Sequence, residues 1–132
     1  MKILFLLLFL SVSSPEDANS TQNLDFWISQ LKSSSIDLQI NALEKLPEIN
    51  NPKATPDIIE SLQSPNAEIR YYAAVALAKL PTHEGLAALA DRLVVEKDVY
   101  VKSEINRSIR KLKDYFDQLE KQKQSESDGK KK

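Results

Sequence analysis

The sequence predicts an all-α fold, namely a short right-handed α-solenoid of about three antiparallel helix pairs. The first observation is an internal repeat, because Ala42–Pro47 recurs further along the chain as Ala76–Pro81 with five of six positions identical. The second is composition: the 132-residue chain has only 2 glycines, few for the tight turns of a β fold. The third is the short spacing between apolar periodic segments, which predicts antiparallel neighbouring helices.

Each repeat unit is expected to contain two helices. Their expected ranges are 24–32, 36–46, 54–63, 67–80, 84–95, and 99 to about 121. Pro47 and Pro81 are expected to end the second helices of the first two units, because proline cannot continue the helical hydrogen-bond ladder. Thr55, Asn66 and Asp98 stand where N-caps are needed. No single unit can bury its apolar stripe, so the units are expected to stack on one another.

The first twenty residues have the pattern of a secretory signal peptide. Lys2 gives a positive start, Ile3–Leu10 is an unbroken apolar run, and small residues follow, so cleavage is expected after Ser13 or Ser20. The apolar run is too short to span a bilayer, which takes about 20 residues. The alternatives are an ordinary buried N-terminal helix and an uncleaved anchor at the membrane interface. The signal peptide predicts a secreted or periplasmic protein with no stable membrane span after its removal.

The rest of the chain divides into a helical repeat domain, residues 21–121, and a charged tail, residues 122–132, which is expected to be disordered. The end of the last helix, beyond Leu112, has two interpretations. It either caps the core by folding against the last unit or docks a partner.

One repeat unit carries a family resemblance. Asn66–Leu80, which reads Asn-Ala-Glu-Ile-Arg-Tyr-Tyr-Ala-Ala-Val-Ala-Leu-Ala-Lys-Leu, resembles the second helix of HEAT-like repeats of the phycobilisome-lyase type. That pattern runs acidic residue, two free positions, Val-Arg, two free, Ala-Ala, one free, Ala-Leu, two free, Leu. Residues 98–112 resemble it more weakly, with Lys102 in place of the arginine. By this resemblance, Arg70 would join a structural ladder of hydrogen bonds between units, with Asp98 as its partner.

A tetratricopeptide array, with a period of about 34 residues, is the alternative fold because the recurrence in this chain has the same spacing. The Trp-Leu-Gly-Tyr pattern of tetratricopeptide first helices is missing from this chain, and the expected helix at 54–63 is short. The HEAT-like interpretation is therefore the preferred one.

The sequence offers little catalytic or metal-binding chemistry. The chain has no cysteine, and its single histidine, His83, is expected in an exposed turn, so an ordinary zinc site is not expected. Carboxylates such as Asp91 and Glu96 lie at helix-surface spacings and are expected to be solvated. Residues 3–96 carry 6 basic and 12 acidic side chains, which argues against nucleic acid as a partner. We therefore expect no catalytic site, no cofactor and no metal.

The face of the repeats that points away from the core is the candidate binding site. Tyr71, Val75 and Lys79 on one second helix are expected to align with Arg107 and Lys111 on the next, and tyrosine and arginine are typical interface anchors. The sequence thus predicts an exported, non-catalytic adaptor that binds a protein or peptide of unknown identity. The alternative, implied only by the resemblance, is an accessory factor or lyase-like enzyme.

Overall fold

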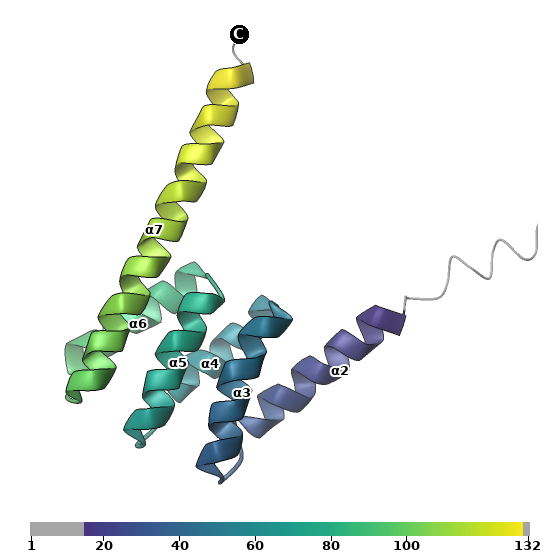
Figure 1. Ribbon diagram of the computed structural model, residues 1–132, viewed down its shortest axis with the longest axis vertical. Coiled ribbons are helices and arrows are strands. Elements are labelled where there is room, and N and C mark those ends of the chain that lie inside the picture. Colours follow the sequence, from purple (N-terminus) through teal and green to yellow (C-terminus); the bar gives the residue numbers. More distant parts are fainter. Residues whose placement is uncertain (1–14, 131–132) are drawn as a thin grey trace, which may run out of the picture.

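The computed structural model describes residues 15–130, and side chains from residue 23 onward. The expected signal peptide therefore lies largely outside the described residues. Within 15–130 the chain forms only helices (Figure 1). Their bounds are α2 (Pro15–Gln30), α3 (Ile36–Ile49), the 3-10 helix η1 (Pro52–Ala54), α4 (Thr55–Ser61), α5 (Ala67–Lys79), α6 (His83–Val95) and α7 (Val99–Lys130).

The helices stack as two layers of a short solenoid. The second helices of the units, α3, α5 and α7, lie side by side in one layer, and α4 and α6 lie behind them (Figure 1). Helix α5 packs against α3 on one side and α7 on the other, while α2 packs on α3 and α6 on α7. The prediction of an all-helical, short solenoid is confirmed.

One apolar core runs through all the units. Leu43, Leu77, Ile105 and Leu112 are at most 1% exposed, and each such side chain stabilises the fold by about 1.5–3 kcal/mol relative to exposure. The small side chains of α5 allow the close approach of its neighbours, because they leave room for facing leucines and isoleucines. Ala73, Ala74 and Ala76 are all buried.

Some predicted helix boundaries are correct, whereas those at Pro47, at Thr55 and at the two outermost helix ends are wrong. Asn66 caps α5 by accepting from the backbone N–H groups of Glu68 and Ile69, as expected, and α5 ends just before Pro81. Pro47, however, lies inside α3, which continues to Ile49 and ends at Asn50 with φ of 56°. A proline near a helix end removes only one hydrogen bond of the ladder, and the αL residue supplies the actual stop.

The expected N-cap at Thr55 is the second wrong boundary. Ala54 holds the cap position and makes no side-chain cap bond. Thr55 instead lies at the start of α4 and is buried. Its Oγ1 has no hydrogen-bond partner within the described part of the chain. The short turn η1 feeds directly into α4, so the backbone is already helical at residue 54 and needs no separate cap.

The outermost helices are longer than expected. Helix α2 begins at Pro15 rather than near residue 24, and α7 runs to Lys130, through most of the segment expected to be a disordered tail. Residues 120–130 are all exposed, so backbone hydrogen bonds and good helix formers such as Lys, Glu and Gln carry that part of α7. Among the described helices, none is both long and apolar enough to cross a membrane.

Candidate protein-binding face and the ladder between units

The second helix of every unit is preceded by the same type of hydrogen bond. A side chain two residues before the N-cap accepts a hydrogen bond from the backbone N–H of the N-cap residue. The three donor and acceptor pairs are Ser35 to Ser33 Oγ (3.1 Å), Asn66 to Ser64 Oγ (3.2 Å), and Asp98 to Glu96 Oε1 (3.1 Å). Because the acceptors are almost evenly spaced along the chain, they identify equivalent places in the three units.

Between the second and third units, the residue at this position is Glu96, which forms a network of ion pairs that we call the ionic ladder. Arg70 of α5 donates from Nε to Glu96 Oε2 (2.8 Å) and from Nη2 to Glu96 Oε1 (3.0 Å). Its Nη1 donates to the Ser64 carbonyl oxygen at 2.8 Å. Arg92 adds a bond from its Nε to Glu96 Oε2 at 3.0 Å. One buried carboxylate thus joins α5, the end of α6 and the start of α7, and paired arginine contacts of this kind are strong because both partners are charged.

The Glu96 carboxylate is held in its ionised form. Burial by itself raises the pKa of Glu96, but hydrogen bonds from Arg70, from the Asp98 backbone N–H and from Arg92 outweigh burial. They hold the pKa at about 2, below its ordinary value of 4.5. The negative charge therefore persists throughout the physiological range and keeps the ladder closed.

Two expectations about this region are wrong. Asp98 is not the partner of Arg70; its Oδ1 caps α7 by accepting from the backbone N–H groups of Tyr100 and Val101. Glu96 is not a solvated surface charge, because it is only 2% exposed. The equivalent residues of the other units, Ser33 and Ser64, carry no charge, so the repeat pattern alone gives no signal for Glu96.

The residues of the expected binding face lie on two adjacent helices. Tyr71 and Val75 of α5 are half-buried and Lys79 is exposed, while Arg107 and Lys111 of α7 are exposed. Elsewhere α5 and α7 are joined by buried contacts. Ser108 Oγ donates to the Ala74 carbonyl oxygen at 2.9 Å, which fixes the register of the two helices. We call the outer surface of α3, α5 and α7 the front face (Figure 1).

Two further tyrosines lie with Tyr71 and are missing from the expected set. Tyr72 is half-buried and its ring meets that of Tyr71 edge to face, with centroids 5.5 Å apart. Tyr100, at the start of α7, is 80% exposed. Together with Glu68, Asp98 and neighbouring residues, Tyr71 and Tyr100 line a hollow of about 250 Å³ between the first turns of α5 and α7.

The position of Tyr100 relative to its helix cap is a signal that could have found it. Tyr100 is the second residue after the capping residue Asp98, just as Glu68 is the second residue after Asn66. Glu68 lies on the outer side of α5, so the same count from the cap places Tyr100 on the front face.

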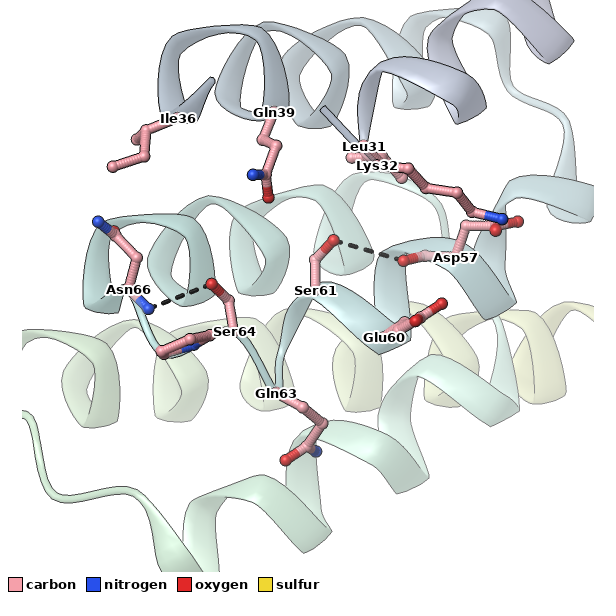
Figure 2. A pocket seen from close by; sticks show the side chains of 11 residues that line it. Leu31, Lys32, Ile36, Gln39, Asp57, Glu60, Ser61, Gln63, Ser64 and Asn66 are labelled. Atoms are coloured by element: carbon pink, nitrogen blue, oxygen red, sulfur yellow. Dashed lines mark hydrogen bonds between the residues drawn. The ribbon is translucent and has the colours of Figure 1, made fainter. Parts of the chain in front are cut away.

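A larger hollow of about 520 Å³ opens between the first and second units (Figure 2). It lies where the α2–α3 turn faces α4 and the α4–α5 turn. Its lining mixes apolar, amide, hydroxyl and charged groups. The residues are Leu31, Lys32, Ile36, Gln39, Asp57, Glu60, Ser61, Gln63, Ser64, Pro65 and Asn66.

The single histidine has a packing role. His83 is the first residue of α6, and its ring stacks on Phe116 with centroids 4.0 Å apart and an interplanar angle of 14°. This contact attaches α7 to the last unit at the point where it begins to extend beyond the stack. Among the described residues, no group of three or more side chains is placed to hold a metal ion.

The comparison with known families decides between the two helical-repeat interpretations. The sequence model for HEAT repeats matches residues 24–110, which is well over half of the chain. The chain belongs to the HEAT-repeat family. HEAT repeats commonly serve as scaffolds for protein interactions, and that coarse role fits this HEAT-repeat chain. A comparison with curated protein sequences finds no match.

Proposed function

We propose that this HEAT-repeat protein is a non-catalytic adaptor that binds a protein or peptide through its front face. The observation that carries the proposal is the tyrosine-lined hollow between α5 and α7. Tyr100 is 80% exposed and Tyr71 half-buried beside it, so a partner could bury a large aromatic area there. Tyrosine is enriched among the residues that dominate binding energy, because it combines apolar area with a polar group and few rotatable bonds.

The charges of the front face support an oriented partner. Lys45 and Lys79 hold the same place in the recurring Ala-Leu-x-Lys-Leu-Pro segment, Lys111 holds the corresponding place in α7, and all three are exposed. Glu68 lies at the opposite end, beside the tyrosines. A segment that crosses the face with a basic end near Glu68 and an acidic end near the lysines would be electrostatically complementary. Such complementarity mainly sets orientation and association rate.

The test compares the full-length protein with front-face variants. Tyr100→Asp and Arg107→Glu should each weaken capture of a partner from culture fluid or envelope extract at least tenfold, measured as bound partner against bait concentration. Tyr115→Asp is the matched control, because Tyr115 is an exposed tyrosine on the extension of α7, away from the hollow. Capture of the same partners with equal strength by both front-face variants would exclude this face.

Export is part of the proposal and is supported by the positive start and the apolar run Ile3–Leu10. The two expected cleavage positions differ in consequence. Cleavage after Ser13 leaves α2 whole from Pro15, whereas cleavage after Ser20 removes its first residues. Mass spectrometry of the N-terminus of the protein recovered from outside the cytoplasm would distinguish them. Recovery only in the cytoplasm with an intact N-terminus would exclude export.

A second candidate, a lyase-like accessory factor, is favoured by one observation, the resemblance of Asn66–Leu80 to repeats of the phycobilisome-lyase type. The absorption spectrum of the protein purified from its own host is the simplest test. A bound chromophore would support this candidate, and a spectrum with tyrosine and tryptophan absorption alone would support the adaptor.

A further inference from the structure

The hollow in Figure 2 lies between the first and second units, at the position that corresponds to the ionic ladder between the second and third units. Gln39 Nε2 donates to the Ser33 carbonyl oxygen at 2.7 Å, and Arg70 Nη1 donates to the Ser64 carbonyl oxygen at 2.8 Å. In both units the donor stands six residues after the acceptor and four after the N-cap. Gln39 is therefore the structural equivalent of Arg70.

The two interfaces between successive units differ at this point. We call the interface between the first and second units the first seam, and the interface between the second and third units the second seam. In the second seam the guanidinium of Arg70 reaches across to the carboxylate of Glu96. In the first seam Gln39 is too short to do so, and Ser64 stands in the place of Glu96. Both Gln39 and Ser64 line the hollow of about 520 Å³. Where a guanidinium meets a carboxylate in the second seam, an amide and a hydroxyl line an open hollow in the first.

The charge of the first seam is also reversed. Arg92, which donates to Glu96, lies four residues before it in the chain. The residue four positions before Ser64 is Glu60, so an acidic residue holds the position in α4 that corresponds to Arg92. Asp57 adds a second carboxylate to the lining, and Lys32 is the one basic residue among the lining residues. The hollow therefore has a net negative lining, which disfavours phosphate and carboxylate ligands and attracts a cation.

We infer that this hollow binds the guanidinium of an arginine side chain supplied by a protein partner. Asp57 and Glu60 offer carboxylate acceptors toward one end of the hollow, and the Ser61 hydroxyl lies between them and Ser64, which lines the other end (Figure 2). A guanidinium presents five N–H donors in a planar fork and is weakly hydrated, so it matches several fixed acceptors better than an ammonium group does.

The apolar part of the lining suits the stem of the same side chain. Ile36, which is 42% exposed, contributes apolar surface to the lining, as do Leu31 and Pro65. Long cationic side chains bury their methylene groups on such surfaces while the charged group reaches polar partners. This site lies at the turn edge of the first seam. It uses none of the residues of the tyrosine-lined hollow and does not depend on the proposed function of the front face.

The experiment is a titration of the ¹⁵N-labelled full-length protein, at low ionic strength, with the peptide acetyl-Gly-Arg-Gly-amide. The matched peptide contains citrulline, which keeps the shape of arginine but has no charge. We expect the arginine peptide to shift the side-chain amide signals of Gln39, Gln63 and Asn66, with at least fivefold higher affinity than the citrulline peptide. A lysine peptide should bind at least threefold more weakly than the arginine peptide.

Variants test the assignment of the carboxylates. Glu60→Gln and Asp57→Asn should each weaken arginine-peptide binding at least threefold, and both replace residues that are not buried, so folding should persist and can be checked in the same spectra. Glu120→Gln, which replaces an exposed carboxylate on α7 outside both hollows, is the control and should bind as the wild type does. Equal binding of the arginine and citrulline peptides, equal binding of the arginine and lysine peptides, or wild-type affinity in both lining variants would overturn the inference. Tyr100→Asp should leave this binding unchanged, so failure here and failure of the front-face proposal can be distinguished.

Discussion

The two seams of this short solenoid share an apolar core but are closed differently at their turn edge. In the second seam the buried Glu96 holds Arg70 and Arg92 through hydrogen bonds of 2.8–3.0 Å. In the first seam Gln39 bonds only within its own unit, and a hollow of about 520 Å³ remains beside it. The residue at one ladder position therefore decides whether the adjacent space between two units holds a buried ion pair or stays open.

The largest expected effect is the loss of the Glu96 charge. Glu96→Gln leaves Arg70, 9% exposed, without a negative partner, and should lower the free energy of unfolding by about 3 kcal/mol. Urea denaturation at pH 7 measures this change. The matched substitution in the first seam, Glu60→Gln, should stay within about 0.5 kcal/mol of wild type because it breaks no buried pair. Equal losses of stability from the two substitutions would contradict the assignment of the buried ion pair to the second seam alone.

The pH dependence of stability should also come from the second seam. Because the pKa of Glu96 is lowered from 4.5 to about 2 in the folded protein, its contribution is full above about pH 4.5 and is lost as the pH falls toward 2. A shift of this size corresponds to about 3 kcal/mol. The difference in unfolding free energy between wild type and Glu96→Gln should shrink by that amount between pH 6 and pH 2. A difference that stays constant with pH would contradict the assignment.

The first seam can be converted into a copy of the second. Gln39→Arg together with Ser64→Glu places an arginine and a carboxylate at the equivalent ladder positions. A double-mutant cycle should give a favourable coupling of about 1–2 kcal/mol, because this edge is more open to solvent than the buried pair. The double variant should also lose binding of the arginine peptide, since its own guanidinium fills the hollow. Zero coupling would mean that the two edges differ in backbone geometry as well as in side chains.

The smallest effect concerns α4, the short helix behind the first seam. Thr55 is 1% exposed, and its Oγ1 has no hydrogen-bond partner within the described residues. Thr55→Val keeps the shape and removes the unsatisfied hydroxyl, so it should raise the free energy of unfolding by about 1 kcal/mol. Thr82→Val is the control, because Thr82 caps α6 through the Gly85 N–H and its loss should destabilise by about 1 kcal/mol. Destabilisation by both substitutions would show that the Thr55 hydroxyl has a partner in solution.

Most of the architecture could be predicted from local pattern. The recurrence of Ala-Leu-x-Lys-Leu-Pro and the cap at Asn66 depend on residues close in the chain, and the structure agrees with both. The errors at Pro47 and Thr55 are also local, because a single residue type does not reveal the helix geometry around it. The register of the repeat places the expected face residues on adjacent helices. It does not identify Tyr100, because Tyr100 lies in the first turn of α7, before the repeating apolar pattern begins.

The helical class, the number of units and the register of their second helices follow from sequence pattern, because helix periodicity and capping are set by neighbours within a few residues. The identity of the carboxylate that completes the ladder depends on how the units pack in space. Asp98 and Glu96 are two residues apart, and sequence spacing favours neither as the partner of Arg70, 26 residues away from Glu96. Burial of the turn between α6 and α7 selects Glu96, and the hollow beside Gln39 likewise arises from how two units meet in space.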